Sequence, residues 1–155
     1  MKALITIFSV IILFFAGFIF YKANQFTTSS KDSTMILIPT DSCAIDKGTC
    51  IFSHSEIGNL EFSIEPLPIK INTEFELSLK TSRPGIDEVR VDFLGVDMDM
   101  GFNRPELLKT AENLFRGKGS LPACTVDRMK WQATVLLKKQ GKTYGAQFYF
   151  STVTK

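Results

Sequence analysis

The strongest constraint on this chain is an uncharged apolar run close to its N-terminus. Residues 3–20 read ALITIFSVIILFFAGFIF and contain no ionisable side chain. As a helix rising 1.5 Å per residue, this run spans about 27 Å, close to the thickness of the hydrocarbon core of a bilayer. We therefore expect one N-terminal transmembrane helix whose partner is the lipid bilayer.

The residues that flank this run suit a helix that stays in the membrane. Lys2 precedes it, and Tyr21 and Lys22 follow it as an aromatic residue and a cation for the headgroup region. A cleavable signal peptide has small residues after a shorter apolar core, whereas here only Ala23 follows two bulky aromatic residues. Residues 1–23 are therefore expected to form an uncleaved signal anchor.

The remainder of the chain divides into a polar linker and one domain. Residues 24–34, NQFTTSSKDST, are rich in Ser and Thr and indicate a flexible linker. Residues 35–155 have a common size for a single domain. Positive charge flanks the helix on both sides, but two residues cannot form a cytoplasmic domain. We expect a single-pass protein of the bacterial inner membrane with its C-terminal domain in the periplasm.

Apolar residues alternate with polar ones in five short segments after residue 35. Such a period of two places the apolar side chains on one face of a β-strand. The five sets are Leu60, Phe62 and Ile64; Phe75, Leu77 and Leu79; Val89, Val91 and Phe93; Met129, Trp131, Ala133, Val135 and Leu137; and Ala146, Phe148 and Phe150.

Turn residues separate these strands and leave little room for crossover helices. The sequence Gln140-Gly141-Lys142 between the last two strands predicts a hairpin. The fold class is therefore mainly β, an antiparallel immunoglobulin-like β-sandwich, and Trp131 is expected to anchor its core. Residues 103–115 leave two alternatives open, a helix capped by Asn103 or a strand-turn-strand through Glu112-Asn113.

The apolar phase changes within residues 89–100. Apolar residues occupy odd positions up to Phe93 and even positions from Leu94 onward. If the segment stays extended, its buried face switches near Gly95, and a β-bulge there would produce that switch.

Three cysteines suggest an oxidising compartment. Cys43 and Cys50 flank a short segment with a good turn, Asp46-Lys47-Gly48, which favours a disulfide between them. The alternative is that Cys124 pairs with one of the two. If Cys43 and Cys50 do pair, Cys124 is a lone thiol in an exported protein.

The candidate metal site consists of sulfur ligands. Met98 and Met100 lie two residues apart, so in a strand their thioethers project from one face, and Cys124 and Met129 are possible further ligands. Soft sulfur ligands select Cu(I) over harder ions. The alternative is structural, because Met commonly fills gaps in protein interiors.

Other function classes find little support in the sequence. Asp97 and Asp99 do not continue into a calcium-loop pattern, because Gly101 stands where another oxygen ligand is needed. His54, the single histidine, is expected at the surface of a polar turn, and no catalytic motif accompanies it. Basic residues form no stripe, so nucleic acid is not expected as a partner.

Two segments carry a resemblance to a known family. The segments VRVDFLGVDMDMGFNRPEL and FRGKGSLPACTVDRMKWQATVLLKKQGKTYGAQFYF, together with the anchor, resemble the small membrane-anchored periplasmic domains grouped as FixH-like or YtkA-like. The resemblance implies an immunoglobulin-like sandwich and a role in copper delivery or respiratory oxidase assembly, with Met98 and Met100 in the family's Met-containing loop. No His accompanies these Met residues, and the three cysteines depart from the family pattern.

These observations lead to two main alternative functions, and a thiol-redox role for Cys124 is a third. The first is a noncatalytic, membrane-tethered accessory protein of the cell envelope that binds Cu(I) transiently through Met98 and Met100. The second is an interaction domain that contacts another envelope or membrane protein and holds no metal.

Overall fold

The computed structural model describes Phe18 and residues 35–40, 43–123 and 128–153. The chain divides into two units, residues 1–33 and 34–155, and every described residue except Phe18 belongs to the second. The predicted anchor and linker therefore lie outside the described residues, apart from Phe18, and so does Cys124. Among the residues that are described, no helix has the length and apolar character needed to cross a bilayer.

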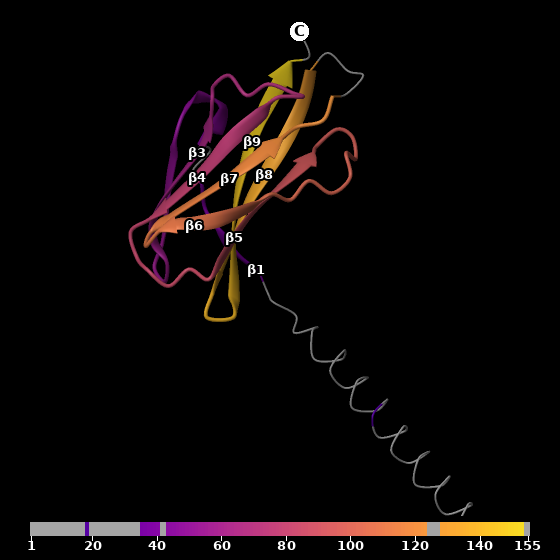
Figure 1. Ribbon diagram of the computed structural model, residues 1–155. Helices are drawn as coiled ribbons and strands as arrows, with labels where there is room; N and C mark the ends of the chain where they lie inside the picture. The colour runs from indigo at the N-terminus through magenta and orange to yellow at the C-terminus, as the bar shows by residue number, and fades with distance from the viewer. Residues whose placement is uncertain (1–17, 19–34, 41–42, 124–127, 154–155) are drawn as a thin grey trace, which may run out of the picture. The chain divides into compact units, whose positions relative to one another are not determined.

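The described chain is built mainly from β-strands, as the alternating sequence pattern predicted (Figure 1). One short 3₁₀-helix, η2, lies between the first two strands. The elements in chain order are β1 Met35–Ile38, η2 Ile45–Lys47, β2 Cys50–His54, β3 Gly58–Glu65, β4 Glu74–Thr81, β5 Glu88–Gly95, β6 Glu106–Ala111, β7 Leu114–Ser120, β8 Arg128–Lys139 and β9 Lys142–Val153.

The five predicted strand sets are confirmed, and all their apolar residues are buried. They lie in β3, β4, β5, β8 and β9, where buried and more exposed residues alternate over most of each strand. Because side chains alternate between the faces of a strand, this pattern also fixes the register in which each strand meets its neighbours.

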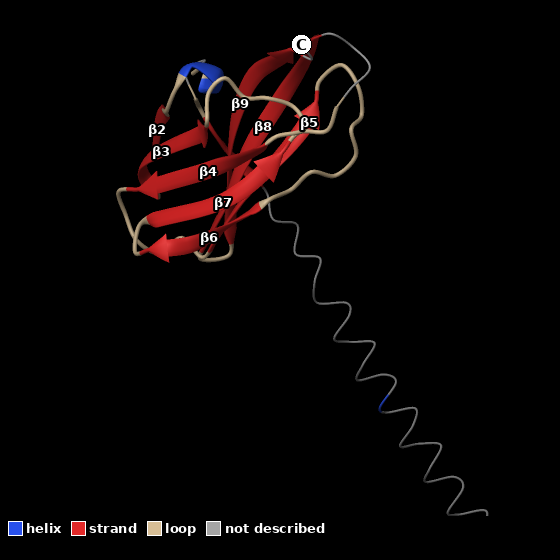
Figure 2. Ribbon diagram, turned by 45° about the horizontal axis from the view of Figure 1, so that its top comes forward, coloured by secondary structure: helices blue, strands red, loops and turns tan. Residues whose placement is uncertain are grey.

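The strands form one sheet in the order β1-β9-β8-β5-β6-β7-β4-β3-β2. All neighbouring pairs are antiparallel except β1 and β9, which are parallel. β6 pairs with β5 at its beginning and with β7 further along, so it links the two halves of the sheet. Figures 1 and 2 show β3, β4, β7 and β6 side by side.

Aromatic contacts show that the two halves of the sheet pack against each other. Phe148 of β9 contacts Phe52 of β2 and Phe62 of β3, with ring centroids 5.4 and 5.6 Å apart. Phe93 of β5 lies edge-on to Phe75 of β4 at 5.6 Å. Offset and edge-on ring pairs add to the stabilisation from burial. The core therefore lies between the β9-β8-β5 half and the β2-β3-β4 half.

Trp131 anchors this core as predicted. Its side chain is completely buried, and its neighbours on β8, Met129 and Ala133, are buried on the same face. A buried indole requires a partner for its N–H group. The hydroxyl oxygen of Thr152 on β9 accepts that hydrogen bond.

Two local predictions are resolved by the strand assignments. Residues 103–115 form no helix; β6 and β7 flank a turn at Glu112-Asn113, so the strand-turn-strand alternative is correct. The predicted β8–β9 hairpin is confirmed, and Lys139 and Lys142 are Cα partners. The two turn residues, Gln140 and Gly141, have φ values of 51° and 76°. Positive φ at both positions gives the turn whose twist matches antiparallel strands.

The predicted disulfide between Cys43 and Cys50 is present, with a Cα–Cα distance of 5.8 Å. The bond fixes the segment that contains η2 to the first residue of β2. Cys50 is fully buried, and Ile45 of η2 is buried in the same core. The disulfide therefore closes a short loop over the interior.

The register places the connections at two ends of this domain. The longer connections 66–73 and 96–105 lie at one end, which we call the long-loop end, where Asn72 and Asn103 hydrogen-bond to the carbonyls of Leu121 and Ser120. The short turns 55–57, 112–113 and 140–141 lie at the opposite end, which we call the hairpin end.

Candidate functional site

The predicted methionine site lies at the long-loop end, around Gly95. Gly95 is the last residue of β5 and the Cα partner of Trp131. A Cβ atom added there would lie 2.3 Å from the terminal carbon of Met129 and 3.1 Å from Cγ of Met100. The same atom would lie 2.3 Å from the carbonyl oxygen of Met98. Glycine is favoured here because the backbone carbonyl of Met98 cannot easily move aside, and the side chains of Met129 and Met100 occupy the remaining space.

The structure brings together two of the four predicted sulfur ligands. Met129 is 3% exposed, and Met100 is partly buried and packs against the core. Met98 places its carbonyl oxygen at Gly95, while its side chain is 43% exposed. Cys124 lies outside the described residues. Met100 and Met129 therefore form the described part of this sulfur cluster, at the edge of the core.

A β-bulge near Gly95 was expected if the segment stays extended, and that condition is not met. β5 ends at Gly95, and residues 96–98 form a bend that leaves the sheet. Three of the four apolar residues at even positions, Leu94, Val96 and Met98, are 40%, 50% and 43% exposed. Met100 alone among them is partly buried, so the even positions do not form a continuous buried face. The amide of Val96 donates a hydrogen bond to the Lys130 carbonyl, which holds the chain near β8 as it turns away. A change of apolar phase does not require burial, because much of any protein surface is apolar.

The two acidic residues of this connection are exposed. The amide of Gly101 donates to Oδ1 of Asp99 at 2.9 Å, which closes a small turn. Asp97 is exposed beside it. Within residues 35–40, 43–123 and 128–153, no three His, Cys, Asp or Glu side chains gather closely enough to hold a metal ion.

A polar cluster that the sequence did not indicate lies at the hairpin end. The Tyr144 hydroxyl donates to Oε2 of Glu56, and the Lys142 ammonium contacts both carboxylate oxygens at 2.9 and 3.0 Å. The hydrogen bonds from Tyr144 and Lys142 hold the pKa of Glu56 below its ordinary value. The bond to Glu56 raises the pKa of Tyr144, and the same carboxylate raises the pKa of Lys142.

His54 belongs to this polar cluster and is only partly at the surface. Its ring lies 5.2 Å from the Tyr144 ring, and its Nδ1 accepts a hydrogen bond from the Glu56 amide. The strand register places His54 at the opposite end from Met100 and Met129. Glu56 lies in the turn between β2 and β3, whereas Lys142 and Tyr144 belong to the β8–β9 hairpin. Because these two segments are far apart in the sequence, no local motif indicates this cluster.

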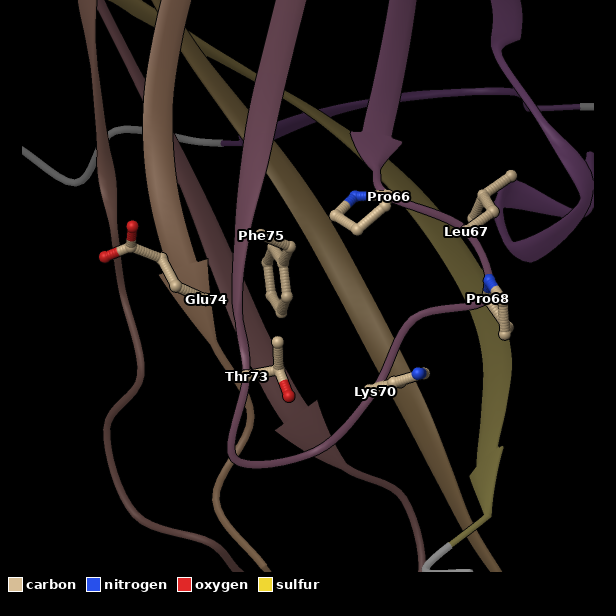
Figure 3. Close-up of a pocket in the computed structure, with 7 residues that line it drawn as sticks. All are labelled: Pro66, Leu67, Pro68, Lys70, Thr73, Glu74 and Phe75. Carbon is tan, nitrogen blue, oxygen red and sulfur yellow. The ribbon is translucent and has the colours of Figure 1, made fainter.

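Two adjoining hollows occupy the connection between β3 and β4. The first has a volume of about 200 Å³ and is lined by Pro66, Leu67, Pro68, Lys70, Thr73, Glu74 and Phe75 (Figure 3). The second is a shallower depression of about 460 Å³, lined by Glu65, Pro66, Leu67 and Glu76. They share Pro66 and Leu67, so a single bound segment can reach both. We call them the Phe75 hollow and the glutamate hollow.

Comparison with known proteins gives little information about function. No family model matches the chain, and no curated protein sequence matches it. Among solved structures, the chain is similar to a DUF4785 family protein from Legionella pneumophila, with a TM-score of 0.43 and 12% sequence identity. The match covers 61% of this chain and 28% of that protein, so the chain spans well under half of its length. A likeness at this level carries no argument about function.

Proposed function

We propose that this chain is a noncatalytic accessory protein of the bacterial inner membrane that binds Cu(I) transiently at its long-loop end. Residues 1–23 would hold it in the bilayer, and an immunoglobulin-like sandwich would face the periplasm. The observation that carries the proposal is the meeting of the Met100 and Met129 side chains over Gly95. The resemblance to FixH-like and YtkA-like domains, with their role in copper delivery or oxidase assembly, supports the same reading.

The chemistry of these residues fits the proposed ion. Thioethers are soft, neutral ligands that suit Cu(I), and they remain available where thiols are oxidised to disulfides. Burial of Met129 against the core supplies one ligand in a fixed position, while Met100 stays partly accessible. Met98 and Cys124 are the proposed additional ligands. The domain would hold these side chains together, and the partly accessible Met100 would let Cu(I) pass to a partner.

A competition experiment tests the copper proposal directly. The full chain, purified in detergent, is titrated with Cu(I) against a chromogenic chelator. We expect stoichiometric binding that is lost in the Met100→Leu/Met129→Leu variant, because Leu conserves volume and removes the sulfur. Met35→Leu is the matched control, since Met35 packs over Gly145 in the β1–β9 pair. No binding by the wild type, or binding that survives the double substitution, would overturn the proposal.

A second candidate function is a metal-free interaction domain for another envelope protein. The two hollows favour it, because they offer a concave surface beside Leu67, whose side chain is 40% exposed. A photo-crosslinking residue at position 67 should give a specific protein adduct in cells, insensitive to a copper chelator. The same residue at position 110, on exposed β6, serves as control. Equal adducts at both positions would contradict this candidate.

A further inference from the structure

The Phe75 hollow has a fixed apolar wall because of its neighbours on β7. Phe75 is 3% exposed, and its Cα partner is Gly119. A Cβ atom on Gly119 would lie 2.6 Å from the Phe75 ring, so glycine leaves the space in which the ring lies. Pro66 and Pro68 form the opposite wall (Figure 3). Proline side chains have almost no rotamer freedom to lose, so contact with these two residues costs little conformational entropy.

The glutamate hollow carries negative charge with no cation in its lining. Glu65 and Glu76 are Cα partners on β3 and β4, and both side chains are exposed. Like charges directly opposite each other in a sheet are destabilising. Lys118 of β7 is the Cα partner of Glu76 and is attracted by its charge, but its ammonium forms its ion pair with Glu74 at 2.7 Å. Within the described part of the chain, neither Glu65 nor Glu76 forms a salt bridge, and Glu65 faces Glu76 with no cation opposite it. This local charge is opposite in sign to the net charge of +2 of the whole chain.

We propose that the two hollows bind an extended segment of a partner protein in which a Lys or Arg lies one or two residues from an apolar side chain. The cation would lie between Glu65 and Glu76, where charge complementarity relieves their repulsion. The apolar side chain would enter the Phe75 hollow. This inference rests on the second candidate function and adds to it the chemistry of the partner.

The two hollows adjoin at Pro66 and Leu67, which suits an extended segment. Residues in a strand advance by about 3.3 Å each, so side chains one or two positions apart can reach adjoining depressions. Lys70 and Glu74 both line the Phe75 hollow, so its rim carries charges of both signs and the selective charge comes from the glutamate hollow. Anionic lipid headgroups would meet two carboxylates there, which disfavours docking on a bilayer surface.

Synthetic peptides provide the test. Two fluorescent peptides, identical except that one contains Leu-Arg and the other Leu-Glu, are added to the purified full chain, and binding is followed by anisotropy at low and high salt. We expect the Arg peptide to bind at least about tenfold more tightly, with an affinity that falls as salt rises. The Glu65→Gln/Glu76→Gln variant should lose most of this preference.

A matched control separates a local effect from a general change in charge. Glu61 lies on the same strand and is exposed, but it pairs with Lys80 at 3.7 Å. Glu61→Gln should retain the affinity within about twofold, because its charge is already compensated. Loss of folding is not expected to confuse the result, since the double variant removes a repulsion. Leu67→Ser should lower the affinity of the chain for both peptides.

Several outcomes would overturn the inference. Equal binding of the two peptides, no binding at all, or an Arg preference that persists in Glu65→Gln/Glu76→Gln would each do so. The cellular crosslink at position 67 then distinguishes a failure of the proposed partner chemistry from a failure of the interaction function itself. If a specific adduct forms while the peptides show no charge preference, the interaction function stands and the partner chemistry is wrong. If no adduct forms, the interaction function itself is contradicted.

Discussion

The indole nitrogen of Trp131 donates a hydrogen bond to the hydroxyl oxygen of Thr152 across 2.9 Å. Both side chains lie inside the domain, with exposed fractions of 0% and 3%. The bond joins the first part of β8 to the end of β9 inside the core. Few polar groups are buried in this interior, so the pairing satisfies a donor that would otherwise have no water to bind.

Removing the acceptor should therefore destabilise the domain. Thr152→Val has nearly the same shape but cannot accept the hydrogen bond, and an orphaned buried donor costs about 1 to 3 kcal/mol. Thr152→Ser keeps the hydroxyl and should lose less. Urea unfolding followed by the fluorescence of Trp131 measures both. Equal stability of the Val variant and the wild type would show that the indole finds another partner.

The polar cluster at the hairpin end predicts a dependence of stability on pH. The pKa of Glu56 is lowered from 4.5, so its contribution is present above that value and is lost as the pH falls through the lowered pKa. Outside the cluster, the hydrogen bond from Lys138 likewise lowers the pKa of Glu88. The raised pKa of Tyr144 and the raised pKa of Lys142 act oppositely: their contribution is present below 10.0 and 10.5 and is lost as the pH rises through the raised values.

Stability from these groups should thus be level between about pH 4.5 and 10 and should fall on both sides. Thermal unfolding of the wild type and of Glu56→Gln across this range provides the test. The variant should be less stable near neutral pH and should show a weaker decline in acid. If the acid decline is unchanged in Glu56→Gln, other carboxylates account for it.

A side chain at Gly95 should disturb the methionine cluster. In Gly95→Ala, the new Cβ meets Met129 and the Met98 carbonyl at 2.3 Å, and the backbone atom cannot move as freely as a side chain. Overpacking of this kind costs about 1 to 3 kcal/mol. We expect a lower unfolding midpoint, with weaker Cu(I) binding if the copper proposal holds. Val96→Ala, one residue further along on an exposed position, is the control and should have little effect.

The disulfide predicts both a thiol count and a stability difference. Three cysteines are present and two of them form the disulfide. Alkylation of the unreduced, denatured chain should therefore modify one thiol per chain, that of Cys124. Closure of a loop this short contributes about 2 to 3 kcal/mol on the chain-entropy model. Cys43→Ala/Cys50→Ala should lose that amount in chemical denaturation. A peptide map that links Cys124 to either partner would contradict this pairing.

Much of the strand structure follows from the sequence because burial there has a simple period. One face of each long strand meets the core, so alternation such as Phe75, Leu77 and Leu79 identifies it. The β8–β9 hairpin is equally local, since Gly141 tolerates the positive φ that the turn requires. The sequence of residues 103–115 is ambiguous because its leucines fit both the helical period of 3.6 residues and the strand period of two. In the structure, β6 pairs with β5 and β7, and these interstrand hydrogen bonds favour strands over a helix.

The candidate sites were less predictable, because contacts between distant segments determine them. Met98, Met100 and Met129 were identified by their sulfur chemistry, but only the end of β5 at Gly95 determines which side chains meet. The Tyr144–Glu56 bond joins residues 88 positions apart, so neither residue is distinctive alone. The hollows likewise depend on Gly119 opposite Phe75, a pairing that no sequence pattern specifies.

The parallel pairing of β1 with β9 has a consequence for how the chain is made. Met35 and Thr143 are Cα partners, so the first strand of the domain must wait for the last before it can join the sheet. Until β9 is complete, a growing chain presents β1 without its partner and β8 with one open edge, and open edges invite pairing with other chains. A chain that ends before Lys142 therefore cannot hide either strand. The sheet can therefore be completed only after β9 has been synthesised.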